Sequence, residues 1–147
     1  MIAQDRVLTS LAKHLATQGL VQYHETAPYT ENPLLPAVTF GALPKDVPTA
    51  VSLNVYNYDP QRDKYNPDVY VQLRFRAGVA FNPLAVHRLA DKVFAELDWP
   101  ENKDPELWPG GVRVQHVCRV VSGLVTPDGN NRYERPDSYR ITLNPGE

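Results

Sequence analysis

The stretch Asp68-Val69-Tyr70-Val71-Gln72-Leu73-Arg74-Phe75-Arg76-Ala77-Gly78 carries the clearest structural signal in the chain. Apolar residues occupy every second position, and side chains of an extended strand point alternately to its two faces. The pattern therefore predicts a half-buried strand. Its apolar face, which closes a core, consists of Val69, Val71, Leu73 and Phe75. Its opposite face offers a cationic, hydrogen-bonding surface made of Tyr70, Gln72, Arg74 and Arg76.

The segments around this strand predict two helices and four further strands. Apolar residues at helical spacing over residues 3–18 indicate an amphipathic helix that stops at Gly19. Asn82 followed by Pro83 is typical of a helix start, and this second helix should end before Trp99. The strands are expected at 37–43, 50–56, 69–76, 112–121 and 133–143.

The order of these elements is helix, three strands, helix, two strands. It predicts a single-domain α+β protein over residues 1–147, in which a mixed or antiparallel sheet of about five strands carries two helices on one face. A length of 147 residues is close to the commonest size of one domain. With 42% hydrophobic and 22% charged residues, the composition is that of an ordinary globular chain.

The net charge of −2 gives the chain no general attraction to nucleic acids or anionic membranes. Six acidic residues and two lysines lie within residues 91–106, whereas five arginines and three acidic residues lie within 112–143. Such asymmetry is usually a solvated face, and the sharper interpretation is charge complementarity between neighbouring copies. The first residues contain no long apolar run, so we expect neither a signal peptide nor a membrane span.

No catalytic or metal-binding signature accompanies this pattern. None of the four histidines has the spacing of a metal site, and glycine-rich phosphate or dinucleotide motifs are absent. Cys118 is the only cysteine, so the chain has no internal disulfide. His116 and Cys118 share a strand face, where we expect a core-edge histidine and a buried apolar thiol. We expect no catalytic residue, no cofactor and no metal.

Tyrosines alternate with cations around a polar, proline-broken loop at residues 57–67. Tyrosine and arginine are enriched at protein interfaces, and the same residues can stack on bases and bind phosphates. We favour a protein interface, because the net charge is negative; a solvated face without a partner is the third interpretation. The expected interface residues are Tyr58, Arg62, Lys64, Tyr65, Tyr70, Gln72, Arg74 and Arg76.

The order of elements resembles that of the bacteriophage tail terminator proteins, also known as minor capsid or head–tail joining proteins. The resemblance covers nearly the whole chain and rests on pattern and order. The segments that carry it are Leu8-Thr-Ser-Leu-Ala-Lys-His-Leu15, Gly19-Leu20-Val21, Asn66-Pro67-Asp68 with the strand that follows, the helix containing Ala90, Val93 and Leu97, Gly110-Gly111-Val112-Arg113-Val114 and Tyr139-Arg140-Ile141-Thr142-Leu143.

The resemblance implies a virion protein without enzymatic activity, assembled in the host cytoplasm. Such proteins form a ring, typically a hexamer, that ends the tail tube and joins the tail to the head. The implied partners are further copies of the chain, the tail tube protein, a head or neck connector protein, and DNA that passes the lumen without sequence-specific binding. The alternatives are another neck component, such as a head-completion or connector protein, a small nucleic-acid-binding module, and an enzyme without a recognisable motif.

Overall fold

The structure, a computed structural model, describes residues 3–65, 67–100 and 103–144. Asn66, part of the segment before the first quoted strand, lies outside the described residues. The chain forms two helices, α1 (Gln4–Thr17) and α2 (Pro83–Leu97). Its strands are β1 (Ala37–Phe40), β2 (Ala50–Asp59), β3 (Asp68–Ala77), β4 (Glu106–Trp108), β5 (Val112–Val121), β6 (Thr126–Pro127) and β7 (Tyr133–Leu143).

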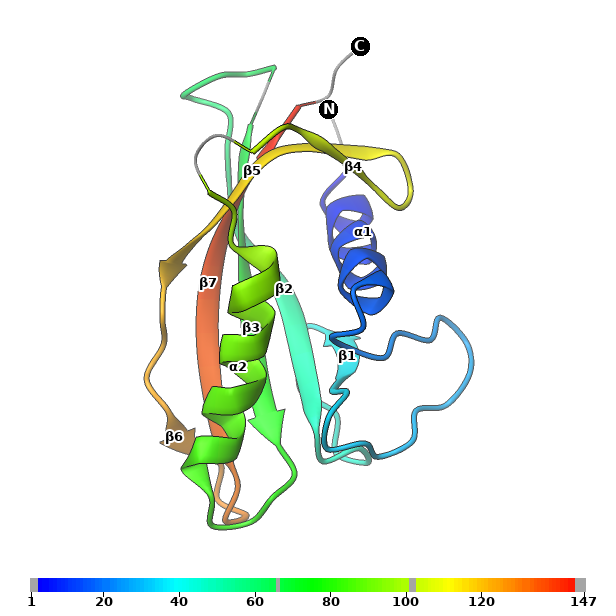
Figure 1. Cartoon of the computed structure of the whole chain (residues 1–147), viewed down its shortest axis with the longest axis vertical. Helices are drawn as coiled ribbons and strands as arrows, with labels where there is room; N and C mark the ends of the chain where they lie inside the picture. Colours follow the sequence, from blue (N-terminus) through cyan, green and yellow to red (C-terminus); the bar gives the residue numbers. More distant parts are fainter. Residues whose placement is uncertain (1–2, 66, 101–102, 145–147) are drawn as a thin grey trace.

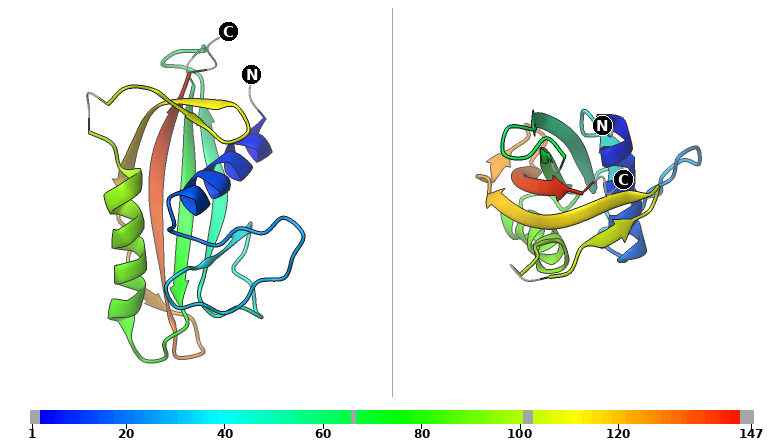
Figure 2. Two further views of the ribbon diagram at one scale, coloured as in Figure 1. Left: turned by 45° about the vertical axis from the view of Figure 1, so that its right-hand side comes forward. Right: turned by 90° about the horizontal axis from the view of Figure 1, so that it is seen from above.

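The strands form one mixed sheet in the order β1-β2-β3-β7-β5-β4. The short strand β6 pairs with the part of β7 that β5 does not cover. β1 runs parallel to β2, and the other pairs are antiparallel. The sheet is strongly curled, and both helices lie on its inner side (Figures 1 and 2). The α+β class and the mixed sheet are thus confirmed. All five expected strands are present, and the short β4 and β6 raise the number to seven among the described residues.

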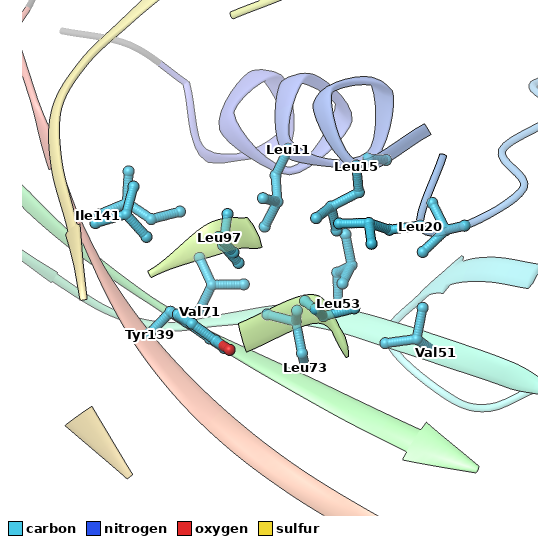
Figure 3. Close-up of a cluster of buried hydrophobic side chains, with 14 of the residues drawn as sticks. Leu11, Leu15, Leu20, Val51, Leu53, Val71, Leu73, Leu97, Tyr139 and Ile141 are labelled. Carbon is cyan, nitrogen blue, oxygen red and sulfur yellow. The ribbon is translucent and has the colours of Figure 1, made fainter. Parts of the chain in front are cut away.

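The core lies between the inner face of the sheet and the two helices (Figure 3). The predicted apolar face of β3 is confirmed, because Val69, Val71, Leu73 and Phe75 have no exposed surface. Leu11 and Leu15 of α1 and Leu97 of α2 point toward this face. One continuous apolar cluster therefore joins the helices to the inner face of the sheet. Its packing fixes the strands whose remaining side chains form the outer face.

Local signals explain where the helices begin and end. Asn82 accepts a hydrogen bond from the backbone N–H of Leu84 at 3.1 Å, and Pro83 occupies the first turn of α2. The hydrogen bond and the position of the proline are the features of the N-terminal cap that the sequence predicts. After α1, Gly19 adopts a positive φ of 73°, which favours glycine, and the chain turns back so that the Leu20 N–H reaches the Leu15 carbonyl.

Candidate interaction surfaces

The outer face of the sheet is the surface turned away from the two helices. β3 contributes Tyr70, Gln72 and Arg74 to it, and all three are half-buried. Arg140 of β7 is the register partner of Tyr70. On the edge of β3 opposite to β7, β2 contributes Tyr56. Its ring lies 6.0 Å from the ring of Tyr70 in a tilted arrangement. Aromatic and cationic groups from three neighbouring strands therefore gather in one patch.

The two arginines of β3 have different roles. The Nη1 atom of Arg74 lies 3.4 Å from the Oε1 atom of Glu134, so its charge is partly balanced on the outer face. Arg76 is only 5% exposed, and its guanidinium donates hydrogen bonds to the carbonyls of Pro44, Val47 and Pro48. The prediction that Arg76 faces a partner needs correction: the link between β1 and β2 covers it, and the arginine holds that link.

The polar loop at 57–67 is shorter than expected because β2 continues to Asp59. Tyr58 lies on β2, where it packs against the core, and burial raises its pKa. Tyr65 is 69% exposed, and the Lys64 ammonium lies 5.1 Å from the centre of its ring. Of these three expected interface residues, Lys64 and Tyr65 are available to a partner, whereas Tyr58 supports the fold.

Arg62 closes the hairpin between β2 and β3. Its Nε and Nη2 atoms each lie 3.1 Å from a carboxylate oxygen of Asp68, and the hydroxyl of Thr142 donates to the same carboxylate at 2.7 Å. Burial is the largest single influence on the pKa of Asp68 and would raise it. The hydrogen bonds from Arg62 and Thr142, together with the nearby positive charges, outweigh burial and hold this pKa below its usual value.

A bulge changes the face to which His116 and Cys118 belong. Val114 points into the core, but the register with β7 shifts between Val114 and His116. His116 and Cys118 consequently stand on the outer face, paired with Thr142 and Arg140, and both are half-buried. The expectation of a buried apolar thiol among valines is therefore wrong, because one irregular residue reverses the alternation.

A buried cluster of charges beneath α2 was not expected. The guanidinium of Arg135 donates to Asp137 at 2.9 Å, to Asp91 at 3.2 Å and to Ser122 at 2.9 Å. Its Nη1 atom also lies 2.8 Å from Nδ1 of His87. Because arginine can only donate, Nδ1 of His87 accepts this hydrogen bond. The cluster fastens α2 and the chain after β5 to the middle of β7.

The same cluster holds residues 122–125, the segment that connects β5 to β6. The Gly123 N–H donates to Asp137 at 3.0 Å, and the backbone of Gly123 passes so close to Pro136 that no side chain would fit. Val121 before the segment is exposed, and Leu124 within it is 79% exposed. Other exposed large apolar side chains include Leu34, Phe40, Phe81, Leu84 and Leu107.

Two negative findings concern the described parts of the chain. No group of three or more histidine, cysteine, aspartate or glutamate side chains is placed to hold a metal ion within residues 3–65, 67–100 and 103–144. In the same residues, neither helix is long and apolar enough to cross a membrane.

Known structures share this fold. The chain is similar to a solved protein whose name, Np_888769.1, describes no activity; the likeness spans 97% of this chain and 96% of that one. The TM-score is 0.59 and the sequence identity 14%, so the likeness concerns the fold alone. No family model matches the chain, and no curated protein does either.

Proposed function

We propose that this chain is a structural virion protein. Copies of it form a ring, of about six by analogy with the resembled family, that ends a phage tail tube and joins the tail to the head. The observation that carries the proposal is the distribution of exposed apolar side chains. Large apolar side chains are exposed at several separate places on the surface and not at one, as expected of a subunit that contacts more than one neighbour.

These places lie on different parts of the molecule. Leu107 is exposed on β4, Leu124 is exposed just after β5, and Phe81 is exposed just before α2. Figure 1 places β4 at the top, the end of β5 at the left and the start of α2 at the bottom. A binding module with one partner needs one such surface. Several separate surfaces suit a subunit that contacts neighbours on two sides and a further component of a particle.

The outer face supplies the polar surface that the proposed ring presents to the tube or the lumen. Tyr70, Gln72 and Arg140 offer hydrogen bonds and one cation there, and Arg74 is balanced by Glu134. Together with the net charge of −2, this arrangement attracts DNA only weakly. Weak attraction is suited to DNA that passes through a lumen without sequence-specific binding.

The second candidate is a small nucleic-acid-binding module, and the neighbouring rings of Tyr56 and Tyr70 favour it. Stacking on such rings is a common way to bind single-stranded nucleic acid. Its weakness is electrostatic, because Arg76 is buried and Arg74 is paired. A different neck component, such as a connector or head-completion protein, would use the same separate surfaces in another place in the particle.

Native mass spectrometry of the purified chain, combined with negative-stain images, separates these functions. The proposal predicts a closed ring of about six copies whose mass does not change when oligonucleotides are added. A single copy that binds oligonucleotides and releases them as salt increases would refute the proposal and support the binding module.

A further inference from the structure

A cleft of about 210 Å³ opens between the first half of α2 and the proline-rich loop before β1. Pro33 and Leu34 line it from the loop, and Ala85 and Leu89 line it from the helix. An apolar cavity of about 150 Å³ can hold benzene. The cleft is therefore large enough for the side chain of a leucine.

The loop wall of this cleft is held in place within the subunit. The side-chain amide of Gln22 donates to the carbonyls of Thr30 at 2.7 Å and Leu35 at 3.0 Å. The carboxylate of Glu31 accepts hydrogen bonds from the backbone and the hydroxyl of Thr49, at 2.8 and 2.7 Å. A surface that is already ordered before binding loses less conformational entropy on docking.

Two cations border the cleft. Arg88 and Lys92 lie one turn apart on α2, and both are exposed. Within the described part of the chain, neither forms an ion pair. An apolar cleft with two cations beside it favours an occupant that carries an apolar side chain and a nearby carboxylate.

The β4 edge of the sheet presents such a combination. β4 is the last strand of the sheet, and its buried Trp108 fixes it to the core while Leu107 is 63% exposed. Glu106 is paired with Lys103 at 2.9 Å. Asp104 is exposed and has no ion-pair partner in residues 3–65, 67–100 and 103–144.

We propose that the β4 edge of one copy docks into the cleft of the next copy, with Leu107 in the cleft and Asp104 beside Arg88 and Lys92. This inference rests on the proposed ring and names the contact that links its subunits. β4 and the start of α2 lie at opposite ends of the molecule (Figures 1 and 2). The contact joins two different surfaces and is therefore heterologous, and its repetition gives a ring when the rotation from one copy to the next closes.

A mixing experiment tests this pairing on the full chain. Leu107→Asp removes the inserted side chain, and Leu34→Asp alters the cleft; both residues are exposed, so folding should be preserved, as circular dichroism can verify. Each variant alone should give the mass of one copy in native mass spectrometry. Their equimolar mixture retains one intact pairing and should give a dimer. Val79→Asp, at an exposed apolar residue outside the pairing, serves as control and should leave self-association intact.

Charge reversal provides an independent test. Asp104→Lys should abolish self-association, and combining it with Arg88→Asp and Lys92→Asp in one chain should restore it. If the wild type forms rings and Leu107→Asp and Leu34→Asp do too, the docking contact is wrong but the ring stands. If both variants are single copies and their mixture also stays so, the pairing is wrong. If the wild type itself remains a single copy, the docking contact and the ring are both refuted.

Discussion

Arg135 and Asp137 bring opposite charges into the core beneath α2. Asp137 has no exposed surface, and it interacts with Arg135 and with the backbone of Gly123. Removing charges from water is expensive, so each member of such a pair depends on the other. The buried ion pair therefore adds little to the net stability of the fold, but it fixes the position of α2 and of residues 122–125.

Loss of one member of this pair should therefore be severe. Asp137→Ala leaves the guanidinium of Arg135 buried without its main partner, and we expect the free energy of unfolding to fall by about 3–5 kcal/mol. Asp104→Ala, at an exposed carboxylate, should change it by less than about 0.5 kcal/mol. Chemical denaturation measures both. Similar losses for the two variants would contradict the structural role of the buried pair.

Two neighbouring residues of β3 should also differ in how much they contribute to the free energy of unfolding. Leu73 is fully buried, so Leu73→Ala should lower the free energy of unfolding by about 2–5 kcal/mol. Gln72 lies on the outer face, and Gln72→Ala should cost less than about 1 kcal/mol in the isolated subunit. Urea denaturation of both variants checks the assignment of the two faces, which equal losses would disprove.

Asp68 should make stability depend on acid pH. Its pKa is held below the ordinary value of 3.8 in the folded chain, so the unfolded chain binds the proton more readily. The stabilisation is complete above the ordinary value and is lost as the pH falls through it toward the lower folded value. Asp68→Asn should flatten the fall in stability over this range, measured by denaturation at several pH values. An unchanged pH dependence would contradict the account.

At the scale of elements, residues 122–125 show how the fold creates an exposed surface. A Cβ atom on Gly123 would lie only 1.6 Å from the carbonyl oxygen of Pro136, too close for any side chain. Gly123 thus lets the segment approach β7 closely enough for its hydrogen bond to Asp137. Leu124 is held in an exposed position as a result.

Gly123→Ala should force this segment away from β7. We expect a loss of at least about 1–3 kcal/mol, the usual range for overpacking. Ser122→Ala, which removes only the hydrogen bond to Arg135, should cost about 0.5–1.5 kcal/mol. Thermal or chemical denaturation compares them. A Gly123→Ala variant as stable as the wild type would show that the segment does not depend on this close approach.

Most elements could be predicted from the sequence because their periodicities are long and regular. α2 has a capping residue, a proline and an apolar stripe, and β3 alternates without interruption. β4 and β6 were missed because three and two residues are too few to show a period. Their pairing depends on the neighbouring strands, which supply the partners for their backbone groups.

The surfaces were less predictable because they depend on contacts between distant segments. The alternation of β3 assigned Tyr70, Gln72 and Arg74 correctly to the outer face, but it could not show that residues 44–48 cover Arg76. A single bulge moved Cys118 from the expected inner face to the outer one. The buried pair carried a usable signal, since Arg135 and Asp137 have the same parity as the core residues of β7.

As a whole, the molecule is one curled sheet with two helices, and we propose that several separate places on its surface serve as contacts. The helices and the inner face hold the fold, while β4, residues 122–125 and the start of α2 expose the apolar side chains that we propose as contacts with other molecules. The outer face adds aromatic and polar groups. No single surface defines the proposed role, because a joining ring must contact its own copies, a tube and a head-side component together.

A cryo-EM reconstruction of the particle or assembly in which this chain is found would decide whether it forms the proposed ring. We expect a closed ring of copies between the end of the tail tube and the head, with DNA or an open lumen along the axis and the β4 edge of each copy against α2 of the next. A particle in which the chain lies elsewhere, or occurs as isolated copies, would contradict the proposed function.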